Sequence, residues 1–217
     1  MERGSLLKIL SLDTVDSTQK YLLRELKSNN IKAPIAVVAK NQTAGIGSRE
    51  NSWKSYEGNL FFSFAVAKAD LPNDLKIESA SIYFAYILKM LLEVYGSAVW
   101  IKWPNDFYIK DKKIGGMITN VVGENIVCGI GLNLLSSPKQ FETLDIKINS
   151  QLFLKEYFEN IAKKLSWKQV FSKYKLEFDK NKNFFAHICG VKLPLREAKL
   201  SYDGSLEING ERIYSLR

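Results

Sequence analysis

Apolar residues gather in short uninterrupted runs over the first 134 positions of the chain, with polar stretches between them. Runs of this length, bounded by turn-forming residues, are typical of strands, and several follow one another as a meander. We expect the tight turns of that meander at Asp111-Lys112 and Gly123. The predicted strands are residues 7–12, 35–39, 59–67, 98–102, 107–110, 113–121 and 125–134.

Other segments show the apolar spacing of helices. Ser17, or Asp16 before it, is typical of a residue that caps the start of a helix. Residues 79–95 predict a core helix, and residues 151–165 and 167–179 predict amphipathic helices. Helices that pack on meandering strands favour an α+β fold with a mixed, mainly antiparallel sheet over a doubly wound parallel fold.

The pattern changes near residue 183. Short alternating segments separated by Gly and Asp follow, and Tyr202-Asp203-Gly204-Ser205 is a strong hairpin signal. These segments predict a small β-barrel-like appendage that is too short to fold without docking on its neighbour. We therefore expect a main domain over residues 1–182 and a small C-terminal domain over residues 183–217.

Composition narrows the class of protein. The 217 residues are 46% hydrophobic and carry a formal net charge of +8, but the lysines are spread along the chain. This distribution favours a solvated surface with a local anion site over a nucleic-acid groove. The start of the chain lacks the features of a signal peptide, and Lys89 and Glu93 interrupt the most apolar helix, so we expect no membrane span. Cys128 and Cys189 show neither metal-ligand spacing nor a CxxC motif, so we expect each to be a buried, reduced thiol, which fits a reducing cytoplasm.

The most informative stretch is residues 102–116, KWPNDFYIKDKKIGG. It combines a Trp-Pro corner, an Asn-Asp pair, closely spaced lysines and a Gly-Gly step. Lys102 and Lys113 border apolar residues, so they are the best candidates to face inward and neutralise a carboxylate or an α-phosphate. Lys110 and Lys112 are expected to be exposed.

Four further features each have two interpretations. The polar loop at residues 42–49 is either a mobile connection or a set of backbone donors around a ligand, and it is not a P-loop. Trp53 belongs either to the core or to a stacking surface for a purine. Asn133 interrupts an apolar run, so its amide must be satisfied by the protein or by a ligand. Likewise, the segment from Asp16 to Gln19 is a helix cap, or it binds an amide or ureido group.

Taken together, these motifs resemble those of the biotin protein ligases. The matching segments, in the order and approximate spacing of that family, are Asp16-Ser17-Thr18, residues 42–60, Lys102-Trp103-Pro104-Asn105-Asp106, Lys112-Lys113-Ile114-Gly115-Gly116 and Gly129-Ile130-Gly131-Leu132-Asn133. The resemblance implies a class II synthetase-like biotin/lipoate ligase fold followed by a small SH3-like domain. It also implies the short form of the enzyme, without the N-terminal DNA-binding domain of some relatives, so we expect no operator binding.

The implied activity uses ATP with Mg²⁺ to convert biotin into biotinyl-5′-AMP, and then transfers biotin to a lysine of the biotin carboxyl carrier protein of acetyl-CoA carboxylase. The expected protein is a cytoplasmic monomer or weak homodimer that binds neither nucleic acid nor membrane. We expect no metal site built from protein ligands alone, because the phosphates supply most of the ligands of Mg²⁺.

The resemblance also assigns roles to residues. Lys113 would bind the carboxylate and α-phosphate oxygens, and Asp106 would orient or deprotonate the incoming lysine. The implied biotin contacts are Ser17, Thr18, Gln19, Gln42, Gly45, Ile46, Gly47, Ser48, Lys113, Gly115 and Gly116. The implied ATP and adenylate contacts are Arg49, Trp53, Lys102, Asn105 and Asn133.

Two positions depart from the family pattern. The loop around Gly45 retains Arg49 where relatives carry several arginines, so we expect a looser hold on biotinyl-AMP. Position 19 is Gln where the family commonly has Asn. The alternatives are a lipoate or octanoate ligase or transferase of the same architecture, which needs an apolar slot, and a basic RNA-binding module, which needs exposed aromatic residues among its cations.

Overall fold

A computed structural model describes residues 7–48, 51–188 and 191–214 of the chain. Its centre is a seven-stranded sheet with the strand order β1-β2-β3-β7-β6-β5-β4. The strands are β1 (Lys8–Val15), β2 (Ile35–Gln42), β3 (Leu60–Ala67), β4 (Trp100–Lys102), β5 (Asp106–Ile109), β6 (Lys112–Val122) and β7 (Asn125–Leu132).

Only one pair of neighbours in this sheet is parallel. Strand β1 runs parallel to β2, and the other five pairings are antiparallel. The mixed, mainly antiparallel class expected from the sequence is therefore confirmed. Gly123 has a φ of 54° and turns β6 into β7, as expected. The turn between β5 and β6 lies at Lys110-Asp111, one residue earlier than expected, because Lys110 adopts the left-handed conformation with a φ of 51°.

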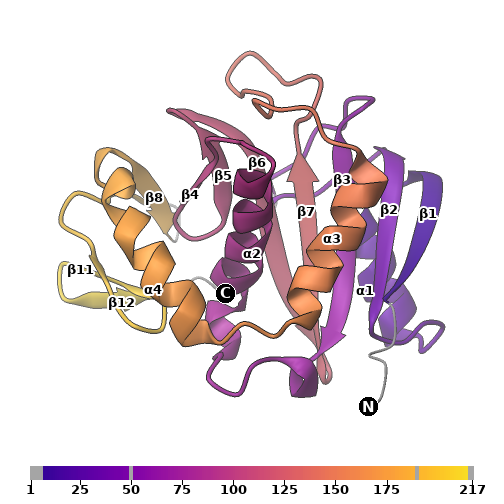
Figure 1. Ribbon diagram of the computed structural model, residues 1–217, viewed down its shortest axis with the longest axis horizontal. Coiled ribbons are helices and arrows are strands. Elements are labelled where there is room, and N and C mark those ends of the chain that lie inside the picture. The colour runs from indigo at the N-terminus through magenta and orange to yellow at the C-terminus, as the bar shows by residue number, and fades with distance from the viewer. Residues whose placement is uncertain (1–6, 49–50, 189–190, 215–217) are drawn as a thin grey trace.

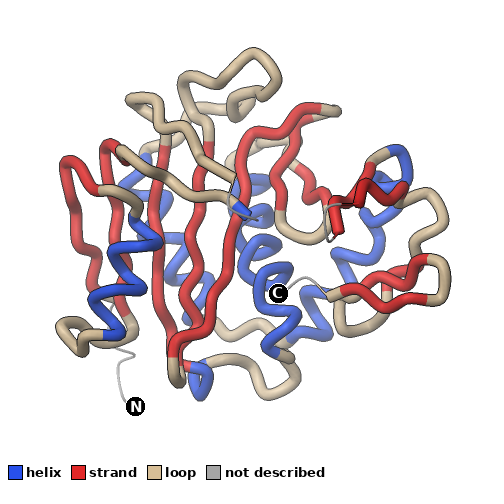
Figure 2. Tube along the Cα trace, turned by 180° about the vertical axis from the view of Figure 1, so that it is seen from behind, coloured by secondary structure: helices blue, strands red, loops and turns tan. Residues whose placement is uncertain are grey.

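Helices cover both faces of the sheet. Helices α2 (Ala80–Val94) and α3 (Ser150–Ala162) lie on one face, and α1 (Thr18–Lys27) lies on the other (Figure 1). Figure 2 shows α1 in front of the sheet from the opposite side. The larger hydrophobic cluster joins α2 and α3 to their face, whereas a smaller cluster under α1 contains Leu22 and Leu26. Amphipathic helices packed on a sheet in this way are the expected result of the apolar spacing.

Helix α1 begins where the sequence predicts. Ser17 is the N-cap in an extended conformation, and its Oγ accepts a hydrogen bond from the backbone N–H of Lys20. Asp16 Oδ1 accepts a hydrogen bond from the backbone N–H of Ser17, so both candidate caps serve the start of this helix. The cap fixes the first turn of α1 directly above the sheet.

Helix α2 is almost wholly buried, as expected for a core helix. Lys89 on this helix is 1% exposed and pairs with Glu93 and Glu177, of which Glu177 ends helix α4 (Trp167–Glu177). The buried ammonium is thus compensated by two carboxylates. No helix within the described residues is both long enough and apolar enough to cross a membrane.

The C-terminal region is rich in strands and packs on the main sheet and helices. It contains β8 (Phe185–Ile188), β9 (Val191–Pro194), β10 (Lys199–Leu200), β11 (Leu206–Ile208) and β12 (Glu211–Ile213), preceded by the 3-10 helix η4 (Phe178–Asn183). The hairpin expected at residues 202–205 joins β10 to β11. Figure 1 shows these strands beside α4, at the β4 end of the molecule.

Three consecutive carbonyl groups of that hairpin hold it against the rest of the protein. The carbonyl oxygens of Tyr202, Asp203 and Gly204 accept hydrogen bonds from Trp167 Nε1, Ser79 Oγ and Trp103 Nε1, at 2.8, 2.6 and 2.8 Å. Apolar residues of this region, such as Leu206, belong to the same hydrophobic cluster as α2 and α3. The small C-terminal region thus shares a hydrophobic core with the rest of the protein.

Candidate functional site

A cavity lies on the α1 face of the sheet, above a floor that contains three glycines. Gly116 of β6 pairs directly with Gly131 of β7, and Gly129 lies two residues before Gly131 on the same face. A Cβ at Gly129 would lie 2.6 Å from Gln19 Oε1, and one at Gly131 would lie 2.7 Å from the Trp53 indole. Glycine is therefore required at these two positions, because other groups already occupy the space above them.

One end of the cavity is neutral and polar. The first turn of α1 supplies Ser17, Thr18 and Gln19, which are 1%, 3% and 2% exposed. Thr18 Oγ1 lies 2.9 Å from the hydroxyl of Ser63 on β3, in a hydrogen bond that either group can donate. Gln19 Nε2 donates to Asn120 Oδ1 at 3.0 Å and to the Val127 carbonyl at 3.2 Å. These contacts fix the amide and hydroxyl groups of the neutral end.

Two buried atoms within the described part of the cavity have no hydrogen-bond partner. They are Gln19 Oε1 above Gly129 and Trp53 Nε1 above Gly131. Unpaired buried polar atoms are costly, and a native protein keeps them where a ligand or water completes the bond. The cavity thus presents one acceptor and one donor to whatever fills it.

Gln42 at the end of β2 closes the same end of the cavity. Its Oε1 accepts hydrogen bonds from the backbone N–H and the hydroxyl of Thr18, at 2.8 and 3.3 Å. Because a backbone N–H can only donate, this contact fixes the amide with Nε2 toward Gly45 of the following loop. Gln42 therefore offers a donor where Gln19 offers an acceptor.

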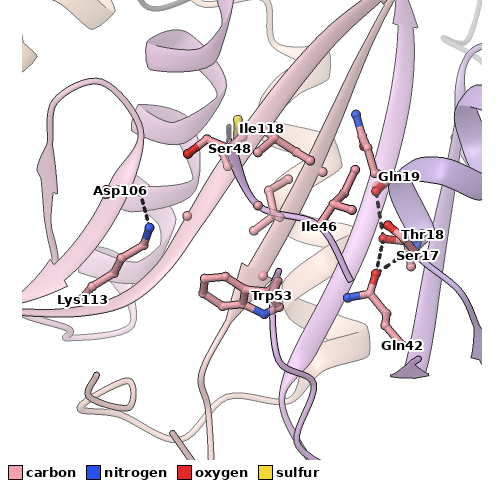
Figure 3. A pocket seen from close by; sticks show the side chains of 17 residues that line it. Ser17, Thr18, Gln19, Gln42, Ile46, Ser48, Trp53, Asp106, Lys113 and Ile118 are labelled. Atoms are coloured by element: carbon pink, nitrogen blue, oxygen red, sulfur yellow. Dashed lines mark hydrogen bonds and ion pairs between the residues drawn. The ribbon is translucent and has the colours of Figure 1, made fainter. Parts of the chain in front are cut away.

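The opposite end of the cavity is charged. Lys113 Nζ lies 2.6 Å from Asp106 Oδ1, and the side chains are each 23% exposed. The two residues come from the neighbouring strands β5 and β6, and Lys102 Nζ lies 3.9 Å from the other oxygen of Asp106. Figure 3 shows this pair on one side of the cavity and Ser17, Thr18, Gln19 and Gln42 on the other.

Trp53 lies between the two ends (Figure 3). Lys113 Nζ is 5.8 Å from the centre of its ring, a cation–π distance, and Phe141 packs on the ring at 6.3 Å. The loop that carries Trp53 folds back on itself, because the Trp53 N–H donates to the Gly45 carbonyl and Ile46 pairs with Ser52. The loop at residues 42–48 is therefore a wall of the cavity in this structure.

Most of the residues expected at a site meet in this cavity. Those that line it are Ser17, Thr18, Gln19, Gln42, Ile46, Gly47, Ser48, Trp53, Asp106, Lys113 and Gly116. Its other lining residues were not singled out from the sequence as contacts: Ser63, Met117, Ile118, Gly129, Ile130 and Gly131. The glycines of β7 carried a signal of close backbone approach, whereas Ser63 carried none, since it lies within an apolar run.

Five of the expected contacts within the described residues lie away from the cavity wall. Gly45 lines a second hollow, formed by residues 42–45 and 52–56. A Cβ at Gly115 would lie 2.5 Å from the Gly131 carbonyl, so this glycine serves the packing of β6 on β7. Lys102 and Asn105 flank the charged end without lining it, and Arg49 is outside the described residues.

Asn133 is the fifth, and it has a structural role. It is 2% exposed, its amide nitrogen donates to the Glu142 carbonyl at 3.2 Å, and its Oδ1 accepts from Asn59 at 3.4 Å. The Asn59 Oδ1 in turn accepts the backbone N–H groups of residues 134–136. The buried amide is thus satisfied by the protein, and it anchors the loop that follows β7.

No group of three or more metal-ligating side chains occurs among the residues that the structure describes. The thiol of Cys128, next to the cavity floor, is fully buried, as the sequence predicts. Burial raises the pKa of this thiol to about 12, and its hydrogen bond with Thr119 offsets only part of that rise. Cys128 is therefore neither a nucleophile nor a ligand at neutral pH.

Comparison with known proteins identifies relatives of the chain. Residues 11–134 match the model of the biotin/lipoate A/B protein ligase family. Over 134 residues the chain is 33% identical to the bifunctional ligase/repressor BirA of Bacillus subtilis, a match that covers 59% of this chain and 41% of that protein. The chain therefore spans about two fifths of the length of the BirA proteins that it matches.

Among solved structures, the chain resembles the biotin acetyl coenzyme A carboxylase synthetase of Helicobacter pylori with bound biotinylated ATP. The two share 41% identity with a TM-score of 0.92, over 96% of this chain and 99% of that one. The biotin protein ligase of Aquifex aeolicus in complex with biotin and ATP gives a TM-score of 0.74 at 22% identity, over 97% and 96% of the two chains, and so shares the fold.

Proposed function

Because the chain belongs to the biotin/lipoate A/B protein ligase family, we propose that it is a biotin protein ligase. In the first step a carboxylate oxygen of biotin bonds to the α-phosphorus of ATP while the bond to pyrophosphate breaks. In the second step a lysine amine of the carrier protein attacks the carboxyl carbon of biotinyl-5′-AMP. An amide forms, and AMP and a proton leave.

The observation that carries this proposal is the pairing of a neutral polar end and a charged end in one cavity. Biotin has the same two parts, a ureido ring that both donates and accepts hydrogen bonds and a carboxylate on an apolar chain. Gln19 Oε1 is an unpaired acceptor for a ureido N–H, and the hydroxyl of Ser17 and the Nε2 of Gln42 are donors for the ureido carbonyl. Ile46 and Ile118 provide the apolar wall between the ends.

Lys113 is suited to the first step. Both the attacking carboxylate and the α-phosphate are anionic, so a cation between them lowers their repulsion and stabilises charge in the transition state. An ammonium group has three donors, so Lys113 can keep its contact with Asp106 and still bind oxygens of both substrates. Trp53 limits the space between the ends and keeps the reacting carboxylate next to Lys113.

Asp106 is the group best placed for the second step. It lies at the charged end, within 2.6 Å of Lys113, and one of its oxygens faces Lys102 at 3.9 Å. A carboxylate at this position can accept a hydrogen bond from the incoming lysine and align its amine with the carboxyl carbon. We assign Asp106 this orienting role and Lys113 the charge-neutralising role.

The nucleotide would extend from the charged end toward the segment at residues 102–105, where Lys102 adds positive charge. Mg²⁺ would arrive with the phosphates of ATP, because the described residues contain no cluster of three acidic or other metal-ligating side chains. We propose the carrier domain of acetyl-CoA carboxylase as the acceptor, supported by the high similarity to the H. pylori synthetase.

The same architecture could serve lipoate, but the neutral end argues against it. The dithiolane ring of lipoate neither donates nor accepts strong hydrogen bonds, so Gln19 Oε1 would remain buried and unpaired. A site built around hydrogen bonds rejects a ligand that lacks them more strongly than an apolar site rejects an extra polar group. Biotin is therefore the substrate that satisfies the cavity.

Exchange of labelled pyrophosphate into ATP tests this proposal. Exchange that depends on biotin, with none in the presence of lipoate or octanoate, is the expected result. Exchange with lipoate but not with biotin would identify lipoate as the substrate in place of biotin. The absence of exchange with all three acids would overturn the proposal. Subsequent transfer to a purified carrier domain, followed by intact mass, tests the second step and the choice of acceptor.

A further inference from the structure

The amide of Gln19 is held in one orientation by two acceptors outside the cavity wall. Its Nε2 donates one hydrogen to Asn120 Oδ1 at 3.0 Å and the other to the Val127 carbonyl at 3.2 Å. Asn120 and Val127 are directly opposite each other on β6 and β7. Both donor hydrogens of the amide are thus used on the sheet, and Oε1 remains for the cavity.

The Val127 carbonyl decides this orientation. Amide nitrogen and oxygen are nearly alike in shape, so an amide next to another amide can turn if both turn together. A backbone carbonyl cannot turn and can only accept. If Gln19 were reversed, its oxygen would face the Val127 oxygen and both hydrogen bonds would be lost. The orientation of the Asn120 amide is then set as well, with its Oδ1 directed at Gln19 Nε2.

We infer that Asn120 is a positioning residue that makes the neutral end of the cavity selective for a ligand with an N–H donor. This inference rests on the proposed function. Asn120 does not line the cavity and its side chain is exposed, so it acts through Gln19 and not by contact with the ligand. A ring atom that cannot donate, placed opposite Gln19 Oε1, would leave that buried oxygen unpaired.

Two substitutions separate positioning from a structural role. Asn120→Asp keeps an acceptor for Gln19 Nε2. Asn120→Ala removes this acceptor, so that of the two acceptors only the Val127 carbonyl still holds the amide. We expect Asn120→Ala to raise the KM for biotin about fivefold, in line with the loss of one hydrogen bond, and to leave the KM for ATP unchanged. Asn120→Asp should keep the KM for biotin close to that of the unmodified protein.

The selectivity itself is the decisive readout. In the unmodified protein, biotin should support pyrophosphate exchange far better than an analogue methylated on the ureido nitrogen that faces Gln19. Both mono-N-methyl analogues are compared with biotin, because either of the two ureido nitrogens could face Gln19. In Asn120→Ala this preference should narrow, because one hydrogen bond instead of two then holds the Gln19 amide, and the reversed orientation becomes less costly. A purely structural defect would weaken biotin and the analogues by the same factor.

The outcomes distinguish this inference from the proposed function. If the unmodified protein shows no biotin-dependent exchange, the proposed function fails. If it shows exchange but both Asn120 variants retain its KM for biotin and its preference over the N-methyl analogues, only the role of Asn120 is overturned. Thermal melting of the variants provides the folding control, and the exposed position of Asn120 makes a large change in Tm unexpected.

Discussion

The two ends of the cavity solve different problems with different physical means. At the neutral end, Ser17, Thr18 and Gln19 are almost completely buried, and hydrogen bonds to the sheet hold the Thr18 hydroxyl and fix the orientation of the Gln19 amide. At the charged end, Lys113 and Asp106 are each 23% exposed and pair with one another. One end is buried and held by contacts with the sheet, and the other is partly exposed to solvent.

The contrast follows from what each end must recognise. A buried neutral group discriminates between ligands by hydrogen-bond geometry, because a wrong partner leaves an unpaired atom in a dry site. A partly exposed charged pair contributes little to stability and is screened by salt. Its cation can, however, pair with an anion that forms during a reaction. Substitutions at the neutral end should therefore change which ligand binds, and substitutions at the charged end should change turnover.

The largest effect is expected from Lys113→Ala. Loss of the cation between two anionic substrates should lower the rate of biotin-dependent exchange by about 10²- to 10³-fold, the usual effect of removing one group that stabilises a transition state. Lys112→Ala is the matched control, because Lys112 is the preceding residue on β6, is 50% exposed and pairs with Glu142 at 3.6 Å. Near-normal exchange in Lys113→Ala, measured at saturating biotin and ATP, would remove the basis for the charged end.

Gly129→Ala tests the neutral end. The new Cβ would lie 2.6 Å from Gln19 Oε1, so either the glutamine or the strand must move, and the acceptor for the ureido group is displaced. We expect a rise of about tenfold or more in the KM for biotin, with the KM for ATP unchanged.

Gly116→Ala provides the comparison at the other end of the same floor. Its Cβ would meet Asp106 Oδ1 at 3.0 Å and Lys113 Nζ at 3.4 Å, which are ends of side chains that can shift. Its effect should fall on kcat more than on the KM for biotin. Equal changes in the KM for biotin in the two variants would contradict the division of the cavity into two ends.

Ionic strength should separate the ends without any mutation. Titration calorimetry of biotin between about 0.05 and 0.5 M KCl should show a two- to threefold loss of affinity, because salt screens the partly exposed Lys113. Biotinol has the same ring but no carboxylate, so its affinity should stay constant across the same range. A parallel loss for both ligands would mean that charge at Lys113 contributes nothing to binding.

The sequence predicted the elements of the site better than their arrangement. The predicted strands, the start of α1 at Ser17 and the buried Cys128 depend on local patterns, and the structure reproduces them. The neighbours of β7 depend on long-range pairing, which no local pattern shows. That pairing places Ser63 of β3 opposite Gly129 and so brings a hydroxyl from an apolar run to the cavity.

The same limit explains Gly115 and Asn133. Both stand in motifs of the family, and the sequence left Asn133 open between a ligand contact and a structural amide. In the structure Gly115 makes room for the Gly131 carbonyl, and Asn133 is satisfied by Asn59 and Glu142. A motif shows that a residue type is needed at a position, but only the three-dimensional neighbours show whether a ligand or the protein itself needs it.

Cys128 gives the smallest expected effect. It precedes Gly129 on β7, but its thiol lies in the hydrophobic cluster of α2 and α3 behind the cavity floor, so its reactivity reports on whether the sheet beneath the neutral end opens. Burial raises the pKa of its thiol to about 12, so on the order of 10⁻⁴ of it is thiolate at pH 8. Peptide mapping should find Cys128 unmodified by iodoacetamide in the native protein and fully modified in denaturant.

The raised pKa also has a consequence for stability. A thiol whose pKa is higher in the folded state favours folding fully at pH values below its unfolded pKa. That contribution is lost as the pH rises from about 9 toward 12. The thiol becomes accessible to the reagent only when the sheet opens. Saturating biotin stabilises the folded state, so it should slow the residual alkylation by the same factor. Alkylation of Cys128 in the native protein as fast as in denaturant would show that the floor of the neutral end opens freely, and the contrast with the charged end would then be lost.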